Sequence, residues 1–285
     1  MAEIRPTATS KPTSAVLAKK SGNSISWIAP VLCLLIGYIL WRFGLGSADN
    51  FEKAGTGWFW PDHHGPKSQI YNMYLGGIVV PVLIGTFLTA IVFVIERFLT
   101  ISKATGTGNN ADFVRKVQYQ LANKNIDAAI AECDKQKGSV GNVMKAGLRR
   151  YKEMITDNEL NTEQKVLAIQ KEVEEATALE LPMLEKNLVF LSTIASVATL
   201  IGLFGTVLGM IRAFAALGED TGGGAAASSL SQGIAEALYN TALGIGTSAV
   251  AIIFYNMFTT RIDSITYGID ESGFTLTQSF ASLYK

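Results

Sequence analysis

Two apolar stretches in the second half of the chain decide the fold. Residues 188–217 read LVFLSTIASVATLIGLFGTVLGMIRAFAAL, and residues 235–258 read AEALYNTALGIGTSAVAIIFYNMF. As a helix, at about 1.5 Å per residue, each run is long enough to cross about 30 Å of hydrocarbon. Two further apolar runs precede them, at 25–46 and 75–99. The sequence therefore predicts an all-α polytopic membrane protein with four transmembrane helices.

The composition agrees with a membrane protein that also has a soluble portion. Hydrophobic residues make up 48% of the chain and charged residues only 17%, against about 25% charge in a soluble domain. The 24 Lys and Arg balance the 24 Asp and Glu, so no basic surface for nucleic acid is indicated. The composition also excludes a wholly soluble enzyme and a fibrous chain. Cys33 and Cys133 fall in a span and in a soluble segment, so we expect no disulfide between them.

The distribution of Lys and Arg between the runs predicts the orientation. The segment 100–187 holds 13 Lys and Arg, whereas 47–74 holds only Lys53 and Lys67, and 218–234 holds none. Positive segments remain on the cytoplasmic side, so we expect both termini inside and two outer loops. The expected organisation is a disordered cytoplasmic tail at 1–24, an additional N-terminal transmembrane helix at 25–46, an outer loop at 47–74, a transmembrane helix at 75–99, a cytoplasmic helical region at 100–187, transmembrane helices at 188–217 and 235–258 separated by an outer loop at 218–234, and a cytoplasmic C-terminal helix at 259–285.

The first apolar run has an alternative interpretation as a secretory signal peptide. It follows a basic leader, and Gly46-Ser47-Ala48 resembles a cleavage region. The long leader and the length of the run favour a retained helix, and the alternative stays open. With either interpretation the second run enters the membrane from outside.

The cytoplasmic segment is expected to be helical throughout. Gly108 stops a helix, an amphipathic stretch opens at Asp112, and two short helices follow at 125–133 and 140–151. No glycine interrupts the chain between Asn161 and Gly202. We therefore predict one helix over 161–217, which Pro182 bends. Two of the transmembrane helices would then extend into the cytoplasmic region.

Small residues recur on one face of each of the last two spans. Such faces let helices approach closely in lipid, and helix packing alone is sufficient to explain them. The predicted packing residues are Ala198, Gly202, Gly205 and Gly209 in the third span, and Ala237, Gly244 and Ser248 in the fourth.

Four polar residues accompany these small faces: Thr206, Thr241, Glu236 and Asn240. Thr206 and Thr241 lie roughly 15 and 9 Å from the outer ends of their spans, so they can share a layer. A carboxyl group inside a span is a candidate functional group. For Glu236 the alternative is an interfacial carboxylate at a helix N-terminus, and for each threonine it is a hydrogen bond to its own helix. We predict that all four line a proton pathway or pore.

Two motifs in these spans resemble a known family. GLFGTVLGM at 202–210 and GIAEALYNTALGIG at 233–246 resemble the signature of the MotA/TolQ/ExbB proton channel family, above all its ExbB and TolQ branch. Ile95-Glu96-Arg97 at the end of the second span is similar too. By motif position, Thr206 and Thr241 match the family's pore-facing threonines, and Glu236 matches its glutamate. The additional helix at 25–46 lies outside the usual three-span plan of ExbB.

The resemblance implies an ExbB-like subunit of a proton-driven motor in the bacterial inner membrane. It implies a homo-oligomer, a pentamer, around an ExbD- or TolR-like single-span partner that carries a transmembrane aspartate, with work done on a TonB-like protein for outer-membrane import. The two outer loops would then be periplasmic. The alternatives are a TolQ-like or motility-type stator subunit, and a passive membrane scaffold. What the motor drives is left open.

No enzymatic site is indicated by the sequence. The spans contain no Ser/His pair, no pair of aspartates and no His-Glu-x-x-His element. His63-His64 would be a poor chelate without further ligands, and Gly222–Gly224 is better explained as a loop than as a nucleotide cradle. We expect no enzyme activity, no cofactor, no metal and no nucleic-acid partner.

Overall fold

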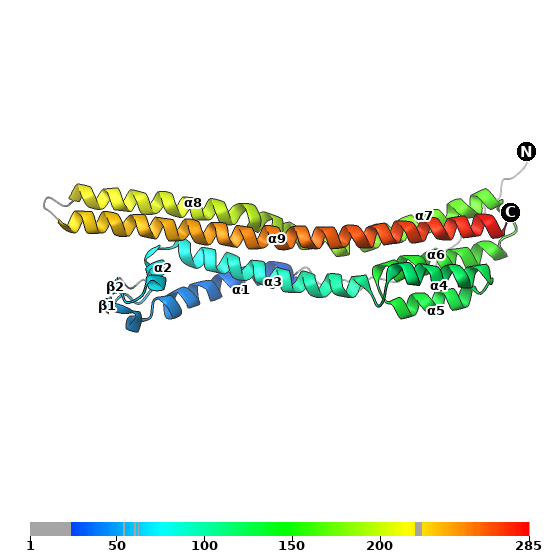
Figure 1. The fold of residues 1–285 in the computed structure, drawn as a ribbon, viewed down its shortest axis with the longest axis horizontal. Helices are drawn as coiled ribbons and strands as arrows, with labels where there is room; N and C mark the ends of the chain where they lie inside the picture. The colour runs from blue at the N-terminus through cyan, green and yellow to red at the C-terminus, as the bar shows by residue number, and fades with distance from the viewer. Residues whose placement is uncertain (1–23, 54, 60, 62, 220–223, 285) are drawn as a thin grey trace, which may run out of the picture.

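Long helices dominate the fold of this elongated molecule (Figure 1). The computed structural model describes residues 24–53, 55–59, 61, 63–219 and 224–284. The expected disordered tail at 1–24 lies outside these residues except for Ser24, as does 220–223 in the second outer loop. In Figure 1, α8 and α9 run side by side along one edge, α3 packs beneath them, and α1 packs against α3.

The membrane half of the molecule confirms the all-α polytopic class. Among the described residues, four helical stretches are long and apolar enough to cross a membrane: Ile28–Leu45, Val79–Ala122, Thr162–Ala215 and Leu230–Leu283. The helices that supply these apolar windows are α1 (Ser24–Ile39) with its π-helical continuation η1 (Leu40–Leu45), α3 (Val79–Thr105), α8 (Leu188–Glu219) and α9 (Gly224–Leu283).

The segment between the first two apolar helices has structure of its own, which we had expected only as a loop. It contains η2 (Ala48–Asn50), β1 (Phe51–Lys53), β2 (His64–Pro66), η3 (Gln69–Tyr71) and α2 (Asn72–Leu75), with β1 and β2 antiparallel. A small aromatic core fixes this segment to η1. The Trp41 and Tyr74 rings stack with centroids 4.5 Å apart, and the Trp41 Nε1 donates to the Tyr74 carbonyl at 3.2 Å.

The other half of the molecule is a helical bundle, formed by the C-terminal half of α9 and four further helices: α4 (Asn110–Ala122), α5 (Ile126–Gln136), α6 (Ser139–Thr156) and α7 (Thr162–Glu185). Asparagine side chains cap the starts of three of them, because an Asn oxygen accepts from the free N–H groups of a first turn. Asn109 caps α4, Asn125 caps α5, and Asn161 forms a capping box with Gln164 on α7.

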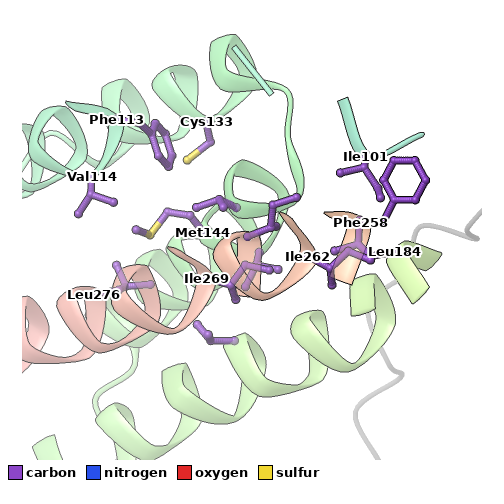
Figure 2. Close-up of a cluster of buried hydrophobic side chains, with 14 of the residues drawn as sticks. Ile101, Phe113, Val114, Cys133, Met144, Leu184, Phe258, Ile262, Ile269 and Leu276 are labelled. Carbon is purple, nitrogen blue, oxygen red and sulfur yellow. The ribbon is translucent and has the colours of Figure 1, made fainter. Parts of the chain in front are cut away.

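One apolar core runs through the bundle and continues to the membrane half (Figure 2). Met144 of α6, and Ile269 and Leu276 of α9, are buried in it. Tyr151 of α6 packs its ring edge-on against Phe280 of α9, with centroids 4.8 Å apart. The last part of α9 is therefore a structural member of the bundle, held by α6 and α7 along its length.

The prediction of one bent helix over 161–217 is wrong, because the chain breaks there into α7 and α8. Pro182 remains inside α7. The interruption comes at Lys186 and Asn187, where Asn187 has φ +67°. Asparagine tolerates this left-handed conformation better than most residues. By contrast, the fourth span and the C-terminal helix are one uninterrupted helix of 60 residues, α9.

Candidate functional site: the seam between α8 and α9

The small residues of α8 and α9 meet along one line of close helix–helix contact, which we call the seam. A Cβ added at Gly244 would lie 2.6 Å from the carbonyl oxygen of Ala198 and 2.9 Å from the Cα of Gly202. A Cβ added at Gly209 would lie 2.9 Å from the Cβ of Ala237. The two backbones therefore touch at these positions, which is possible only because the side chains are absent or small.

Two more of the predicted packing residues complete the seam. Ser248 donates a hydrogen bond to the carbonyl of Ala195 on α8. Gly205 faces Asn240, whose Cβ lies 2.7 Å from the position that a Gly205 Cβ would take. The structure thus places all seven predicted packing residues on the contact between α8 and α9 of one chain.

Thr206 and Thr241 lie at the centre of this seam and are hydrogen-bonded to each other through their hydroxyl oxygens. Both are half-buried. The Gly202 carbonyl lies 3.3 Å from each hydroxyl oxygen and accepts from the hydroxyl whose proton is not used between the two threonines; for Thr206 this is a bond within its own helix and for Thr241 a bond across the seam. The two hydroxyls share one layer, and both the own-helix bond and the interhelical contact are present.

Such a pair can position a hydrogen-bonding group but cannot itself carry charge. A threonine hydroxyl has one donor and two acceptor lone pairs, and it does not titrate in the physiological range. Exposed apolar side chains lie within one helical turn of the pair, among them Leu203 and Val207 of α8 and Leu238 and Ile245 of α9. The site is therefore a small polar spot on an otherwise apolar face.

Asn240 lies apart from the threonine pair. It is 2% exposed, and its Nδ2 donates to the carbonyl of Gly76, at the end of α2, at 3.1 Å. Within the described residues its Oδ1 accepts no hydrogen bond. The sequence already contained the signal for this separation: adjacent residues on a helix are 100° apart, so the Asn240 and Thr241 side chains point in different directions.

Glu236 lies one turn before Asn240 and is half-buried. Its Oε1 accepts a hydrogen bond from Gln232 Nε2 at 3.2 Å, on the same helix. Thr206 and Thr241 are therefore the two predicted pathway residues that the structure brings into contact, whereas Glu236 and Asn240 have other partners.

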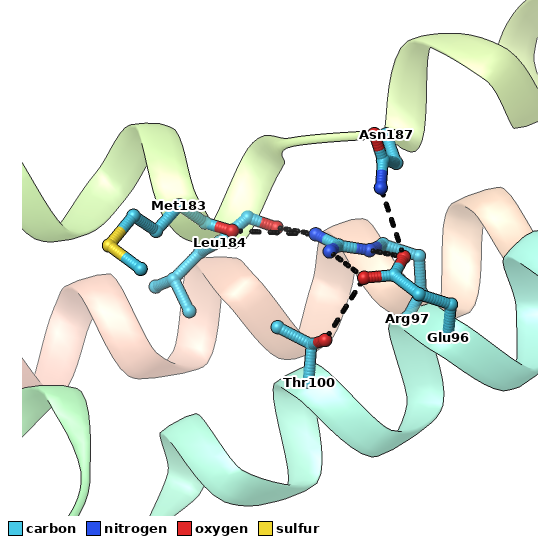
Figure 3. Close-up of polar contacts among 6 residues, drawn as sticks. All are labelled: Glu96, Arg97, Thr100, Met183, Leu184 and Asn187. Carbon is cyan, nitrogen blue, oxygen red and sulfur yellow. Dashed lines mark hydrogen bonds and ion pairs between the residues drawn. The ribbon is translucent and has the colours of Figure 1, made fainter. Parts of the chain in front are cut away.

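A second polar cluster lies where α3 passes the break between α7 and α8 (Figure 3). Arg97 is 2% exposed and donates from its Nε and Nη2 to the two carboxylate oxygens of Glu96, at 2.6 and 2.5 Å. Its Nη1 donates to the carbonyl of Leu184 at 3.0 Å. Arg97 thus binds a carbonyl that the end of α7 leaves without a helical partner.

Asn187 joins this cluster from the other side of the break, donating from Nδ2 to Glu96 Oε2 at 3.2 Å. The contact of the Glu96–Arg97 pair with α7 and Asn187 was not predicted from the sequence. Lys186-Asn187 before the apolar run was the available signal, because asparagine is favoured at left-handed helix ends.

No described part of the chain offers a metal site of three or more His, Cys, Asp or Glu side chains. His63 uses both ring nitrogens within the fold: its Nδ1 accepts from the Gly55 N–H at 3.0 Å, and its Nε2 donates to the Gly46 carbonyl at 3.1 Å. Neither nitrogen is left for an ion.

Comparison with known proteins places the chain in a family. The sequence profile of the MotA/TolQ/ExbB proton channel family matches residues 135–271, which contain the whole α8–α9 seam. An ExbB-like biopolymer transport protein of Synechocystis sp. is 32% identical over 183 residues, covering 64% of this chain and 81% of that protein.

Two relatives are Tol-Pal system proteins TolQ. The Haemophilus influenzae protein is 43% identical over 99 residues, covering 32% of this chain and 41% of that protein. The Pseudomonas aeruginosa protein is 28% identical over 183 residues, covering 59% of this chain and 78% of that protein. The resemblance carried by the two motifs is thereby confirmed: this chain belongs to the MotA/TolQ/ExbB proton channel family.

Proposed function

We propose that this chain is an ExbB-like subunit of a proton-driven motor in the bacterial inner membrane, with both termini in the cytoplasm. It would couple the proton motive force, with an ExbD-like single-span partner, to work on a TonB-like protein for outer-membrane import. The observation that supports this proposal best is the Thr206–Thr241 pair, which lies half-buried on an apolar face in the part of the chain that matches the family.

The threonine pair would serve the aspartate of the partner helix. Copies of the chain, a pentamer in our proposal, enclose that helix with their α8–α9 seams. A charged carboxylate accepts hydrogen bonds from the two hydroxyls. A proton entering from the periplasm neutralises the carboxylate, and the partner helix then leaves one threonine pair for the next. Each charge that crosses about 100 mV supplies roughly 2.3 kcal/mol, enough to shift packed helices relative to each other.

Replacing Thr241 by valine tests this proposal. Valine has nearly the same shape but no hydroxyl, so we expect the complex to assemble and proton-dependent work to stop. Thr260→Val is the matched control, because Thr260 lies exposed on the same helix and, among the described residues, its hydroxyl bonds to no group but the Asn256 carbonyl, at 3.0 Å. The measurements are the size of the purified complex and uncoupler-sensitive uptake across the outer membrane.

The two alternatives give different outcomes. Normal uptake in the Thr241→Val variant would contradict the motor proposal, and uptake that uncouplers never affect would favour a passive scaffold. A TolQ-like role has support from the TolQ relatives. A deletion strain that loses envelope integrity and keeps uptake would favour that role. In both motor cases we propose that the chain is not an enzyme and needs no cofactor.

A further inference from the structure

The helix α1 presents small residues to α3 and large aliphatic residues to its surroundings. A Cβ added at Gly37 would lie 2.6 Å from the backbone nitrogen of Gly85, and a Cβ added at Gly85 would lie 2.7 Å from the Cα of Leu34. In contrast, Leu35 is 60% exposed and Ile39 is 51% exposed. Small residues characterise contacts between membrane helices, and large aliphatic residues characterise a face in contact with acyl chains.

A cationic pocket lies at the end of this lipid-type face, where η1 meets the β1–β2 segment. Its volume is about 240 Å³, and Arg42, Phe43, Pro61 and His63 are among the residues that line it. Arg42 donates from Nε and Nη2 to the Trp58 carbonyl at 3.4 and 3.3 Å, which are long bonds for a guanidinium. None of the ion pairs found among the described residues involves Arg42.

Exposed aromatic side chains surround the pocket. Trp58 is 90% exposed and Phe43 is 68% exposed. The Phe59 ring stacks on Tyr38 with centroids 5.1 Å apart, and the Tyr38 hydroxyl donates to the Phe59 carbonyl at 2.9 Å. Tyr38 lies seven residues before Leu45, the end of the apolar window, or roughly 10 Å along the helix axis. The Trp58–Phe59 segment therefore lies beside the last turns of the apolar window, and aromatic residues are enriched near the ends of membrane spans.

We propose that this pocket binds the phosphate group of a membrane phospholipid. The Arg42 guanidinium forms charge-assisted hydrogen bonds to the phosphate oxygens, for which its planar fork is well suited. The acyl chains lie along Leu35 and Ile39, and Trp58 and Phe43 lie at the level of the glycerol. A cation at the edge of the hydrocarbon is costly without an anion, and a phosphate supplies one. The bound phospholipid thereby connects the β1–β2 segment to one leaflet of the bilayer.

The test measures lipid binding to the purified full-length protein in detergent by native mass spectrometry. It compares two lipid probes that have the same acyl chains. Phosphatidylglycerol carries the phosphate, and diglucosyl diacylglycerol lacks it. For the wild-type protein we expect phosphatidylglycerol to bind at least fivefold more tightly. Arg42→Gln is expected to abolish this preference, and Arg42→Lys to retain part of it. Arg115→Gln, which removes an exposed arginine of α4, is the control that leaves it unchanged.

Several outcomes would overturn the proposal. Equal binding of the two lipids to the wild-type protein would show that the acyl chains alone decide binding, and this comparison needs no variant to fold. An unchanged preference in Arg42→Gln would place the phosphate elsewhere. Competition by glycerol phosphate at the same concentration would indicate a site for free phosphate. A photocrosslinker at Ile39 that captures another protein chain in place of lipid would show that α1 faces a protein.

Discussion

Arg97 is the residue that holds three helices together at the α7–α8 break. Its side chain is on α3, its ion-pair partner Glu96 contacts Asn187 before α8, and its Nη1 binds the end of α7. Hydrogen bonds to a charged group contribute about 1.5–3 kcal/mol each, and here they form around a guanidinium that is 2% exposed. None of the exposed arginines in the described part of the chain has this set of contacts.

We predict that Arg97→Gln lowers the free energy of unfolding by roughly 3 kcal/mol, because Glu96 loses its cation and the Leu184 carbonyl loses its donor. Arg150→Gln is the control, since Arg150 forms a pair with Glu153 in which both side chains are more than a third exposed; it should cost less than about 1 kcal/mol. Denaturant unfolding in detergent measures both. Equal effects of the two variants would contradict the structural importance of the buried cluster.

Cys133 gives a prediction about pH. It is 3% exposed in the bundle, and burial raises the pKa of its thiol to about 12, from about 8.5 in an unfolded chain. The folded protein therefore keeps a proton that the unfolded chain loses, and stability falls as the pH rises above about 9. Between pH 9 and 10.5 we expect the wild-type protein to lose about 2 kcal/mol more than Cys133→Ala. Parallel pH dependences of the two proteins would contradict a buried thiol.

At the scale of elements, the contact between α8 and α9 depends on particular glycines. Gly244 and Gly246 are two residues apart on α9, yet a Cβ at Gly244 meets the Ala198 carbonyl and a Cβ at Gly246 meets nothing within 4 Å. Overpacking of this kind costs about 1–3 kcal/mol, whereas alanine at an open helix position is favoured over glycine.

We therefore predict that Gly244→Ala destabilises the protein by about 2 kcal/mol and disrupts the threonine pair, whereas Gly246→Ala is neutral or stabilises by up to about 1 kcal/mol. Unfolding in detergent measures the change in stability of both variants. The uptake assay used for Thr241→Val measures the effect on the threonine pair. Equal stability and equal uptake in the two variants would contradict the claim that the close approach of α8 and α9 excludes a Cβ at position 244.

The sequence predicted most of the elements because hydrophobicity and small-residue spacing encode them directly. Thr206 and Thr241 were expected in one layer from their depths alone, and they are in contact. The break at Asn187 was not predicted, because a change in one backbone dihedral leaves the surrounding hydrophobic pattern unaltered. The β1–β2 segment was not predicted either, since its strands are three residues long and show no alternation to recognise.

At the scale of the whole molecule, the four spans make the two ends of the elongated fold chemically different. The β1–β2 segment and the bundle lie at opposite ends in Figure 1. The density of Lys and Arg in the bundle puts it in the cytoplasm in our proposal. The orientation then fixes which end of the α8–α9 seam receives protons.

Cysteine labelling tests this orientation. Ser68 and Ser282 are both exposed, near the β1–β2 segment and at the end of α9, whereas the native Cys33 and Cys133 are buried. In spheroplasts, a membrane-impermeant maleimide should label Ser68→Cys and should label Ser282→Cys only after lysis. The reverse pattern would invert the proposed topology, and labelling of both without lysis would remove one span from it.

The two helices of the seam differ in mechanical character. α8 is connected to α7 through the break at Asn187, and the Glu96–Arg97 pair of α3 binds both sides of that break. α9 has no such break, and its 60 residues form a rod of about 90 Å. A tilt of about 5° at one end of such a rod moves the other end by roughly 8 Å. The fold therefore combines one helix that ends at the α7–α8 break with one that connects the threonine layer directly to the far end of the bundle.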